Sequence, residues 1–168
     1  MFDPETLALA EQVLAACRAR NWHLATAESC TGGLVAAALT AIADSSDVVE
    51  RSFVAYSNEA KMELLGVTAD TIAAHGAVSA QACAAMVRGA VARAPVDLAV
   101  SIVGVAGPGG GTPQKPVGLV YLGVARKDGT ARIERRIFPG DRTEIRYAAL
   151  LLALELLRDE GTLIRSVP

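Results

Sequence analysis

Apolar residues recur along this chain with two alternating periods, one typical of helices and one typical of strands. Apolar positions repeating every three or four residues predict a series of helices. These helices span residues 6–20, 34–43, 58–65, 68–74, 79–93 and 141–157. Runs rich in β-branched and small apolar residues separate the helices and predict strands. The strands span residues 23–27, 48–57, 97–105, 117–125 and 130–138.

The order of these segments predicts the fold class. Helices and strands alternate over most of the chain, as in α/β proteins whose helices cover both faces of a sheet. The run from Asp97 to Val105 is almost continuously apolar, which indicates a strand buried on both faces. Asp128-Gly129, between the last two strands, is a hairpin turn signal. We therefore predict a three-layer α/β/α sandwich with a mixed, mostly parallel sheet and an antiparallel hairpin, as a single domain over residues 1–168.

Composition narrows the classes of function. The chain has 168 residues, of which 52% are hydrophobic, enough for a large core. Its formal net charge of −2 argues against nucleic-acid and anionic-membrane partners, because both require a basic face. Cys17, Cys30 and Cys83 are not spaced as metal ligands or as a CxxC pair, which indicates free thiols. The sequence contains neither a signal peptide nor an apolar run long enough to span a bilayer, so a cytoplasmic protein is expected.

The segment Ser29-Cys30-Thr31-Gly32-Gly33 lies between a predicted strand and a predicted helix, where a tight turn is expected. Its two glycines let the backbone approach a ligand closely. The first N–H groups of a helix lack intrahelical partners, so they favour an anion or a developing oxyanion. Ser29 is the favoured nucleophile, and it needs a neighbouring base that removes its proton.

Histidine and lysine are the two kinds of base that this sequence offers. His23 lies at the start of the preceding strand, about 20 Å from Ser29 along an extended chain, and His75 stands in a loop with no obvious acid beside it. Lys61 follows a second junction between a strand and a helix. If the two strands are parallel neighbours, Lys61 reaches Ser29 and forms a Ser-Lys pair. Burial would lower the pKa of Lys61 toward the neutral form that a base requires.

Each of these residues also has a structural interpretation. Tyr56 ends the second strand and is a candidate proton relay, but a half-buried strand tyrosine is an equally good description. Lys61 is equally a solvated helix residue. Cys30 could be acidified at the helix N-terminus, although it lacks a partner imidazole. Thr31 is explained as well by capping of the following helix as by ligand binding.

The glycine-rich segment from Gly104 to Thr112 is a second candidate for ligand binding, because it follows a buried strand. Its N–H groups could form an anion-binding concavity, with Lys115 or Arg142 as counter-charges. It does not match the phosphate-binding motifs of P-loop or dinucleotide-binding proteins. Arg142 stands in the first turn of the last helix, where the helix dipole disfavours a cation, so a ligand and simple exposure both explain it.

Six ordered motifs carry a family resemblance. They are AESCTGG at 27–33, YSNEAK at 56–61, HGAVS at 75–79, GVAGP at 104–108, KPVG at 115–118 and GDR at 140–142. Together they closely resemble the CinA C-terminal domain family, the nicotinamide-nucleotide amidases, over Leu7 to Leu157. The resemblance implies hydrolysis of the carboxamide of nicotinamide mononucleotide to nicotinate mononucleotide and ammonia, a salvage step in the pyridine nucleotide cycle. The chain is similar to the stand-alone form, which lacks an N-terminal molybdopterin-binding-like domain.

The resemblance also implies roles for individual residues. Ser29 corresponds to the proposed nucleophile of the family and Lys61 to its base, with Tyr56 beside them. Neither a metal nor another cofactor is implied, and the expected partners are the small nucleotide and a second copy of the chain in a homodimer. The residues expected to contact the substrate are Cys30, Thr31, Gly32, Gly33, Asn58, Gly104, Gly107, Thr112, Lys115 and Arg142.

Two other functions remain open from the sequence. The first is a catalytically silent nucleotide-binding or regulatory module linked to competence or the DNA damage response, since a fold does not by itself fix an activity. The second is an amidase for a different small amide. Ammonia release from nicotinamide mononucleotide separates these alternatives from the favoured function.

Overall fold

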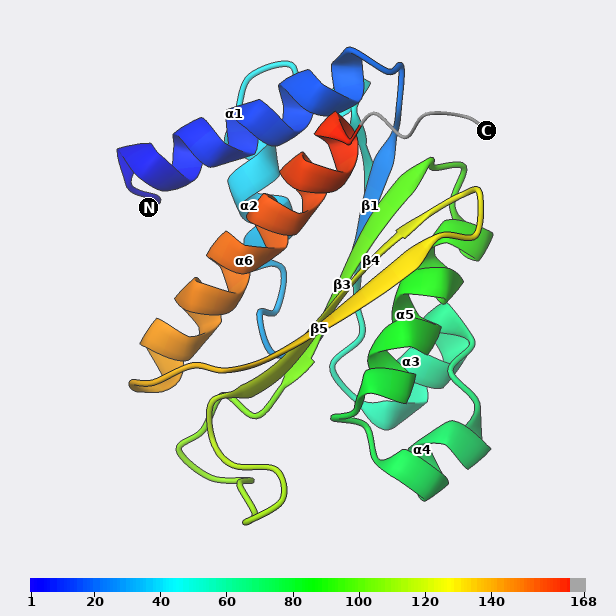
Figure 1. Cartoon of the computed structure of the whole chain (residues 1–168), viewed down its shortest axis with the longest axis vertical. Coiled ribbons are helices and arrows are strands. Elements are labelled where there is room, and N and C mark those ends of the chain that lie inside the picture. Colours follow the sequence, from blue (N-terminus) through cyan, green and yellow to red (C-terminus); the bar gives the residue numbers. More distant parts are fainter. Residues whose placement is uncertain (164–168) are drawn as a thin grey trace.

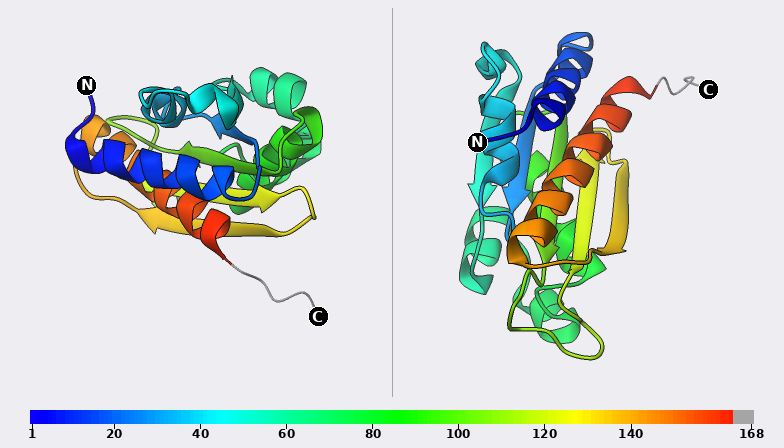
Figure 2. Two further views of the ribbon diagram at one scale, coloured as in Figure 1. Left: turned by 90° about the horizontal axis from the view of Figure 1, so that it is seen from above. Right: turned by 90° about the vertical axis from the view of Figure 1, so that its left-hand side faces the viewer.

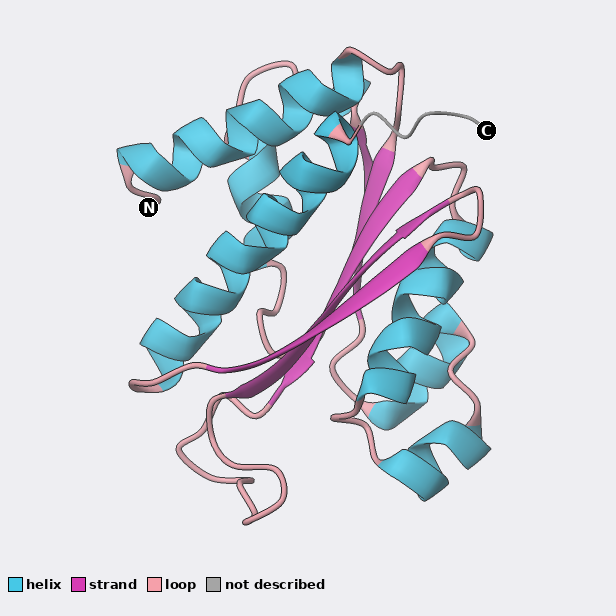
Figure 3. Cartoon of the chain, viewed as in Figure 1, coloured by secondary structure: helices cyan, strands magenta, loops and turns pink. Residues whose placement is uncertain are grey.

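The computed structural model describes residues 1–163 as three layers, with helices on both faces of one sheet (Figures 1 and 2). Most of the chain is in regular helices or strands (Figure 3). The helices are α1 (Pro4–Arg18), α2 (Leu34–Thr40), α3 (Asn58–Leu65), α4 (Ala69–His75), α5 (Ala80–Arg93) and α6 (Arg142–Thr162), with a short 3₁₀ helix at Ser45–Asp47. The strands are β1 (Leu24–Glu28), β2 (Val49–Val54), β3 (Leu98–Gly104), β4 (Leu119–Arg126) and β5 (Ala131–Ile137).

The sheet has the strand order β2-β1-β3-β4-β5. Strand β1 lies between β2 and β3 and is parallel to both, while β3, β4 and β5 pair antiparallel in succession. The hairpin between β4 and β5 turns at Gly129, whose φ of +90° favours glycine, and the Thr130 N–H donates to Asp128 Oδ1 at 2.9 Å. The predicted α/β fold with a mixed sheet and an antiparallel hairpin is therefore confirmed.

Strand β3 separates two hydrophobic cores, because its side chains alternate between the two faces of the sheet. Leu98, Val100 and Ile102 pack in the core beneath α1, α2 and α6. Ala99 and Val103 pack in the opposite core, beneath α5 and α3. The prediction that this strand is covered on both faces is confirmed, and the centre of the sheet is held rigidly by packing on each side.

Helix α3 packs tightly on α5 at a point that requires glycine. A Cβ atom built on Gly89 of α5 would lie 1.8 Å from the carbonyl oxygen of Leu65, at the end of α3. No other residue type allows this approach without moving a helix. The contact matters for the site because α3 carries Lys61.

Two helices differ in length from their predicted spans, for local and tertiary reasons. Helix α2 ends at Thr40, where the Thr40 hydroxyl donates back to the Ala36 carbonyl at 2.7 Å, three residues before the predicted end. Helix α6 continues to Thr162, beyond the predicted end at Leu157. Its additional turn carries Glu160, which pairs with Arg126 of β4. Among residues 1–163, no helix combines the length and the apolar character needed to cross a membrane.

Candidate active site

The carboxyl ends of β1, β2 and β3 meet around a cavity of about 210 Å³. The predicted adjacency of the first two strands is confirmed, and it brings Ser29 and Lys61 to the same cavity. Ligands of open α/β sheets bind at this edge. The lining residues come from five segments of the chain and are Ser29, Cys30, Tyr56, Asn58, Lys61, Ala77, Val78, Val103, Gly104, Ala106 and Arg142.

The turn that carries Ser29 is fixed to the sheet by its backbone. The Ser29 N–H donates to the Ile102 carbonyl of β3 at 2.9 Å, and the Gly32 N–H donates to the Ser29 carbonyl at 3.0 Å. Gly32 and Gly33 have φ values of +63° and +97°, which L-residues with side chains rarely adopt. The glycines therefore make the tight turn possible, and Ser29 itself is 7% exposed at the cavity.

Glu28, directly before Ser29, occupies the N-terminus of α2 with its own carboxylate. Its side chain is fully buried and accepts hydrogen bonds from the Gly33, Val35 and Ala36 N–H groups at 2.9–3.1 Å. The expectation that these first helical N–H groups are available to a ligand anion is therefore wrong, because an internal anion binds them. The sequence alone left the orientation of Glu28 unresolved.

Two further expectations about this turn are corrected. Thr31 does not cap α2, because Gly33 is the N-cap residue and the Thr31 Oγ1 atom is buried without a hydrogen-bond partner among the described residues. Cys30 is not acidified by the helix, because burial raises the pKa of its thiol to about 12. Its sulfur is therefore protonated at neutral pH. Cys17 and Cys83 are buried in the cores, as predicted.

Lys61 is a buried amine at the floor of the cavity, only 2% exposed. Its Nζ donates to the carbonyl oxygens of Ala55, Tyr56 and Ser57 at 3.1, 3.3 and 3.4 Å. No ion pair joins Lys61 to a carboxylate within residues 1–163. Desolvation by burial lowers the pKa of Lys61. The alternative that Lys61 is a solvated surface residue is therefore wrong.

Tyr56 and Arg142 form a polar bridge across the mouth of the cavity. Arg142 Nη2 donates to the Tyr56 hydroxyl at 2.8 Å, and Nη1 donates to the Gly107 carbonyl at 2.7 Å. Strand β2 ends at Val54, so Tyr56 follows the strand and does not end it, contrary to the prediction. Tyr56 is also 59% exposed, so it is not the half-buried strand residue that the pattern suggested. Within the described chain its hydroxyl bonds to Arg142, whereas Lys61 binds the Tyr56 backbone carbonyl.

The remaining candidate residues lie outside the lining of the cavity. Gly107 contributes its carbonyl to Arg142. Thr112 and Lys115 form a local turn, in which the Lys115 N–H donates to the Thr112 hydroxyl at 3.0 Å. The Lys115 ammonium donates to the His75 carbonyl at 2.6 Å and so joins this loop to the end of α4. None of these three residues lines the cavity.

Sequence reasoning missed four apolar lining residues and one arginine. Ala77, Val78, Val103 and Ala106 line the cavity, and nothing in their residue type distinguishes them from core positions. Arg146 donates from Nε to the Cys30 carbonyl at 3.0 Å and from Nη2 to the Thr31 carbonyl at 2.9 Å. Its position four residues after Arg142, on the same face of a helix, was a usable signal.

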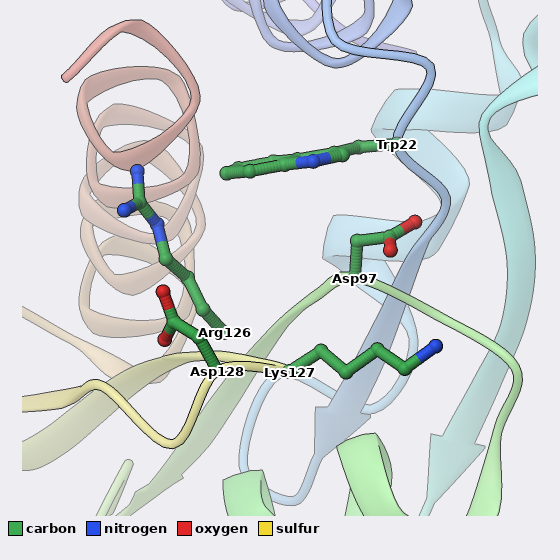
Figure 4. A pocket seen from close by; sticks show the side chains of 5 residues that line it. All are labelled: Trp22, Asp97, Arg126, Lys127 and Asp128. Atoms are coloured by element: carbon green, nitrogen blue, oxygen red, sulfur yellow. The ribbon is translucent and has the colours of Figure 1, made fainter. Parts of the chain in front are cut away.

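A larger cavity of about 360 Å³ opens at the opposite end of the sheet (Figure 4). It is lined by Trp22, Asp97, Arg126, Lys127 and Asp128, among which there is neither a hydroxyl nor a thiol nucleophile. The Arg126 side chain runs toward α6 (Figure 4). Its guanidinium pairs with the Glu160 carboxylate of that helix. Neither histidine lines the cavity at Ser29. The smaller cavity is therefore the candidate active site.

Comparisons with known proteins identify the family to which the chain is similar. The sequence model of one protein family, the CinA C-terminal domain, matches residues 6–160 of this chain. The nicotinamide-nucleotide amidohydrolase PncC of Escherichia coli strain K12 is 48% identical over 157 residues, which cover 94% of this chain and 95% of that protein. A CinA-like protein of Mycolicibacterium gilvum is 49% identical over 158 residues, which cover 94% of this chain but 37% of that protein.

Solved structures show the same fold. The competence/damage inducible protein CihA from Agrobacterium tumefaciens superposes with a TM-score of 0.91 at 44% identity, and the match covers 94% of this chain and 96% of that chain. A CinA superfamily protein from Klebsiella pneumoniae has a TM-score of 0.89 at 38% identity, with 93% and 97% of the two chains covered.

Proposed function

This chain belongs to the CinA C-terminal domain family, and on that premise we propose that it hydrolyses the carboxamide of nicotinamide mononucleotide to nicotinate mononucleotide and ammonia. The high identity to an amidohydrolase of nicotinamide nucleotides over nearly the whole of both chains supports this substrate. The observation that carries the proposal is that Ser29 and Lys61 line one cavity. This activity places the protein in pyridine nucleotide salvage.

Lys61 is the base that activates Ser29 in this proposal. A protonated lysine has three N–H donors, and a neutral one has two donors and a lone pair. Carbonyl oxygens at 3.1, 3.3 and 3.4 Å can hold the neutral amine through two hydrogen bonds and leave its lone pair for the Ser29 proton. Burial without a carboxylate partner favours this neutral form, since it lowers the pKa of Lys61.

The reaction then proceeds through an acyl-enzyme. Lys61 takes the Ser29 proton, Ser29 Oγ bonds to the amide carbon, and the carbonyl oxygen becomes an oxyanion. Collapse of this intermediate breaks the C–N bond, and the nitrogen leaves as ammonia with a proton returned by Lys61 or Tyr56. Water cleaves the resulting ester, releasing nicotinate mononucleotide and restoring the Ser29 hydroxyl.

Arg142 is the strongest candidate for holding the substrate's 5′-phosphate. It lines the cavity, and two of the five N–H donors of its guanidinium are used by Tyr56 and Gly107. The remaining donors suit a phosphate. Thr112 and Lys115 are proposed as secondary contacts. Arg142→Ala should raise KM for nicotinamide mononucleotide about 10-fold or more while leaving KM for nicotinamide riboside nearly unchanged.

We also propose a cellular compartment and an oligomeric state for the enzyme. We place it in the cytoplasm, which agrees with its free and buried cysteines. A homodimer is the expected assembly, and exposed apolar side chains such as Val54 and Leu64 are candidates for its interface. Sedimentation at several concentrations would measure the assembly directly.

Ammonia release tests the function. The wild-type protein should release one ammonia per nicotinamide mononucleotide consumed, and Ser29→Ala should release none above background. The conservative control is Ser57→Ala, which removes a helix-capping hydroxyl at the neighbouring junction but leaves Ser29 intact.

The outcomes separate the three functions. No release by the wild type, together with binding of the nucleotide, would favour a silent binding module. Release from another amide but not from this nucleotide would identify a different amidase. Equal release by wild type and Ser29→Ala would reject Ser29 as the nucleophile.

A further inference from the structure

Arg146 of α6 contacts the Ser29 turn without lining the cavity. Its guanidinium donates to the Cys30 carbonyl at 3.0 Å and to the Thr31 carbonyl at 2.9 Å. Arg146 lies more than a hundred positions after Cys30 and Thr31 in the sequence, so this contact forms only when α6 packs on the sheet. No ion pair of Arg146 with a carboxylate occurs within residues 1–163. Within the described residues, the Arg146 guanidinium therefore binds two backbone carbonyl groups and no carboxylate.

Binding these two carbonyl oxygens fixes the orientation of the turn's N–H groups. In a trans peptide unit, the C=O of one residue and the N–H of the next point in opposite directions. Arg146 therefore sets the direction of the Thr31 N–H through the Cys30 carbonyl, and that of the Gly32 N–H through the Thr31 carbonyl. The Gly32 N–H in turn holds the Ser29 carbonyl at 3.0 Å, which sets the direction of the Cys30 N–H.

Three of the five N–H groups of the turn, which runs from Ser29 to Gly33, bind other parts of the protein. The Ser29 N–H binds Ile102, the Gly32 N–H binds the Ser29 carbonyl, and the Gly33 N–H binds the Glu28 carboxylate. The Cys30 and Thr31 N–H groups donate no hydrogen bond to another described residue. Arg146 directs the Thr31 N–H through the Cys30 carbonyl, and it directs the Cys30 N–H indirectly, through the Gly32 N–H that holds the Ser29 carbonyl.

We propose that Arg146 is a positioning residue that orients the Cys30 and Thr31 N–H groups toward the oxyanion formed when Ser29 attacks the amide. This proposal rests on the proposed amidase function. Arg146 touches neither substrate nor nucleophile. Its positive charge also polarises the Cys30 and Thr31 carbonyl groups, which strengthens the N–H groups of the same peptide units, those of Thr31 and Gly32, as donors. Donors held in place before the reaction stabilise an oxyanion most effectively.

The kinetic test compares Arg146→Ala with two other arginine variants of α6. Arg146→Ala should lower kcat about 100-fold, the usual loss for an oxyanion donor, with KM within about threefold of wild type. Arg142→Ala should instead raise KM. Arg158→Ala, which removes an arginine far along the same helix, should leave both constants unchanged. Guanidinium ion, added well below denaturing concentrations, should restore part of the kcat of Arg146→Ala and none of that of Lys61→Met.

Amide hydrogen exchange tests the positioning independently of activity. The Gly32 N–H should exchange at least about 10-fold faster in Arg146→Ala, because the Thr31 carbonyl of the same peptide unit is no longer held by the guanidinium, while the Leu39 N–H within α2 should be unaffected. Unchanged exchange at Gly32, or a kcat within threefold of wild type in an active enzyme, would overturn the proposal. If the wild type hydrolyses no nicotinamide mononucleotide, the proposed function fails and the exchange result alone decides the role of Arg146.

Discussion

Each end of the sheet buries a cation, and the two cations are held in different ways. At the amino end of β1, the Arg126 guanidinium is 7% exposed and lies 2.9 Å from the Glu160 carboxylate, which is 4% exposed. At the carboxyl end, Lys61 is equally buried, but within residues 1–163 its ammonium group donates hydrogen bonds only to carbonyl oxygens. Carbonyl dipoles compensate a desolvated charge less fully than a carboxylate does.

This difference separates a structural ion pair from a candidate catalytic group. Arg126 is always charged, and its pairing with Glu160 joins β4 to the last turn of α6. Lys61 can relieve its burial by losing a proton, which is the state that a general base needs. At the end of the sheet with the larger cavity, the buried charge is therefore neutralised by a carboxylate, as is usual for a structural ion pair. The smaller cavity contains the proposed nucleophile and base, Ser29 and Lys61.

The largest expected effect is on turnover. Lys61→Met should lower kcat about 1,000-fold or more, because the base is lost while a side chain of similar length fills its site. Circular dichroism and thermal unfolding should show a folded protein. If the Lys61→Met variant is active, Lys61 has no more than a structural role, like Arg126, and the proposed base is rejected.

The same variant has a pH-dependent consequence for stability. Because folding lowers the pKa of Lys61, the unfolded state binds more protons between that pKa and about 10.4, the value of a free lysine. The unfolding free energy of the wild type should therefore rise relative to that of Lys61→Met as pH increases through this window. Urea unfolding at several pH values measures the difference, and a constant difference would contradict the shift.

The next effect concerns the opposite end of the sheet. Glu160→Ala should lower the unfolding free energy by about 3–5 kcal/mol, because it leaves the Arg126 charge buried and unpaired, while kcat of the folded enzyme stays the same. Asp47→Ala, which breaks the exposed pair with Arg18, is the control and should change stability far less. A small loss in Glu160→Ala would show that Arg126 does not depend on its carboxylate.

Glu28 gives an intermediate effect. Its carboxylate accepts three backbone N–H groups and the Thr26 hydroxyl. Glu28→Gln replaces one accepting oxygen by an NH₂ group, which cannot accept these bonds, and should cost about 1–3 kcal/mol of unfolding free energy. Thr26→Val, which removes one of the four donors, should cost less. Equal stability of wild type and Glu28→Gln would contradict the assigned hydrogen bonds.

The smallest effect is expected at Thr31. Its hydroxyl oxygen is buried without a hydrogen-bond partner in the described chain, so replacement by the isosteric valine loses no bond. Thr31→Val should change the unfolding free energy by less than about 1 kcal/mol, with stabilisation the expected sign. Urea unfolding that shows a clear loss would mean that the hydroxyl has a partner. KM of this variant then reports whether the hydroxyl contacts substrate.

The sequence was sufficient for the fold because its signals are local or periodic. The alternation of apolar segments predicted all six α-helices and all five strands of residues 1–163, although not the 3₁₀ helix at Ser45–Asp47. Two of the predicted helices begin at Ser79 and Asp141, which are the N-cap residues of α5 and α6. Helix α6 was predicted too short because its last turn depends on the pairing of Glu160 with β4. That contact is tertiary, and no local pattern reports it.

The parts of the site that follow from strand order could be predicted from the sequence. The parts that depend on the direction of a side chain could not. Parallel neighbouring strands bring Ser29 and Lys61 to one cavity, as expected from the repeated junction of strand and helix. The inward direction of Glu28 and the reach of Arg146 to the turn depend on packing across the sheet. Propensity gives no information on either direction, and the spacing of Arg142 and Arg146 indicates only that the two side chains share a helix face.

A titration of the lysine side chains tests the central claim most directly. The chain has two other lysines, Lys115 and Lys127, so the ε-methylene carbon signals of all three can be followed by NMR, with Lys61→Met used for assignment. We expect Lys61 to titrate at a clearly lower pH than the other two, and kcat/KM to rise with pH through the same pKa. A Lys61 that titrates together with Lys115 and Lys127, or above them, would contradict the claim that a neutral buried amine activates Ser29.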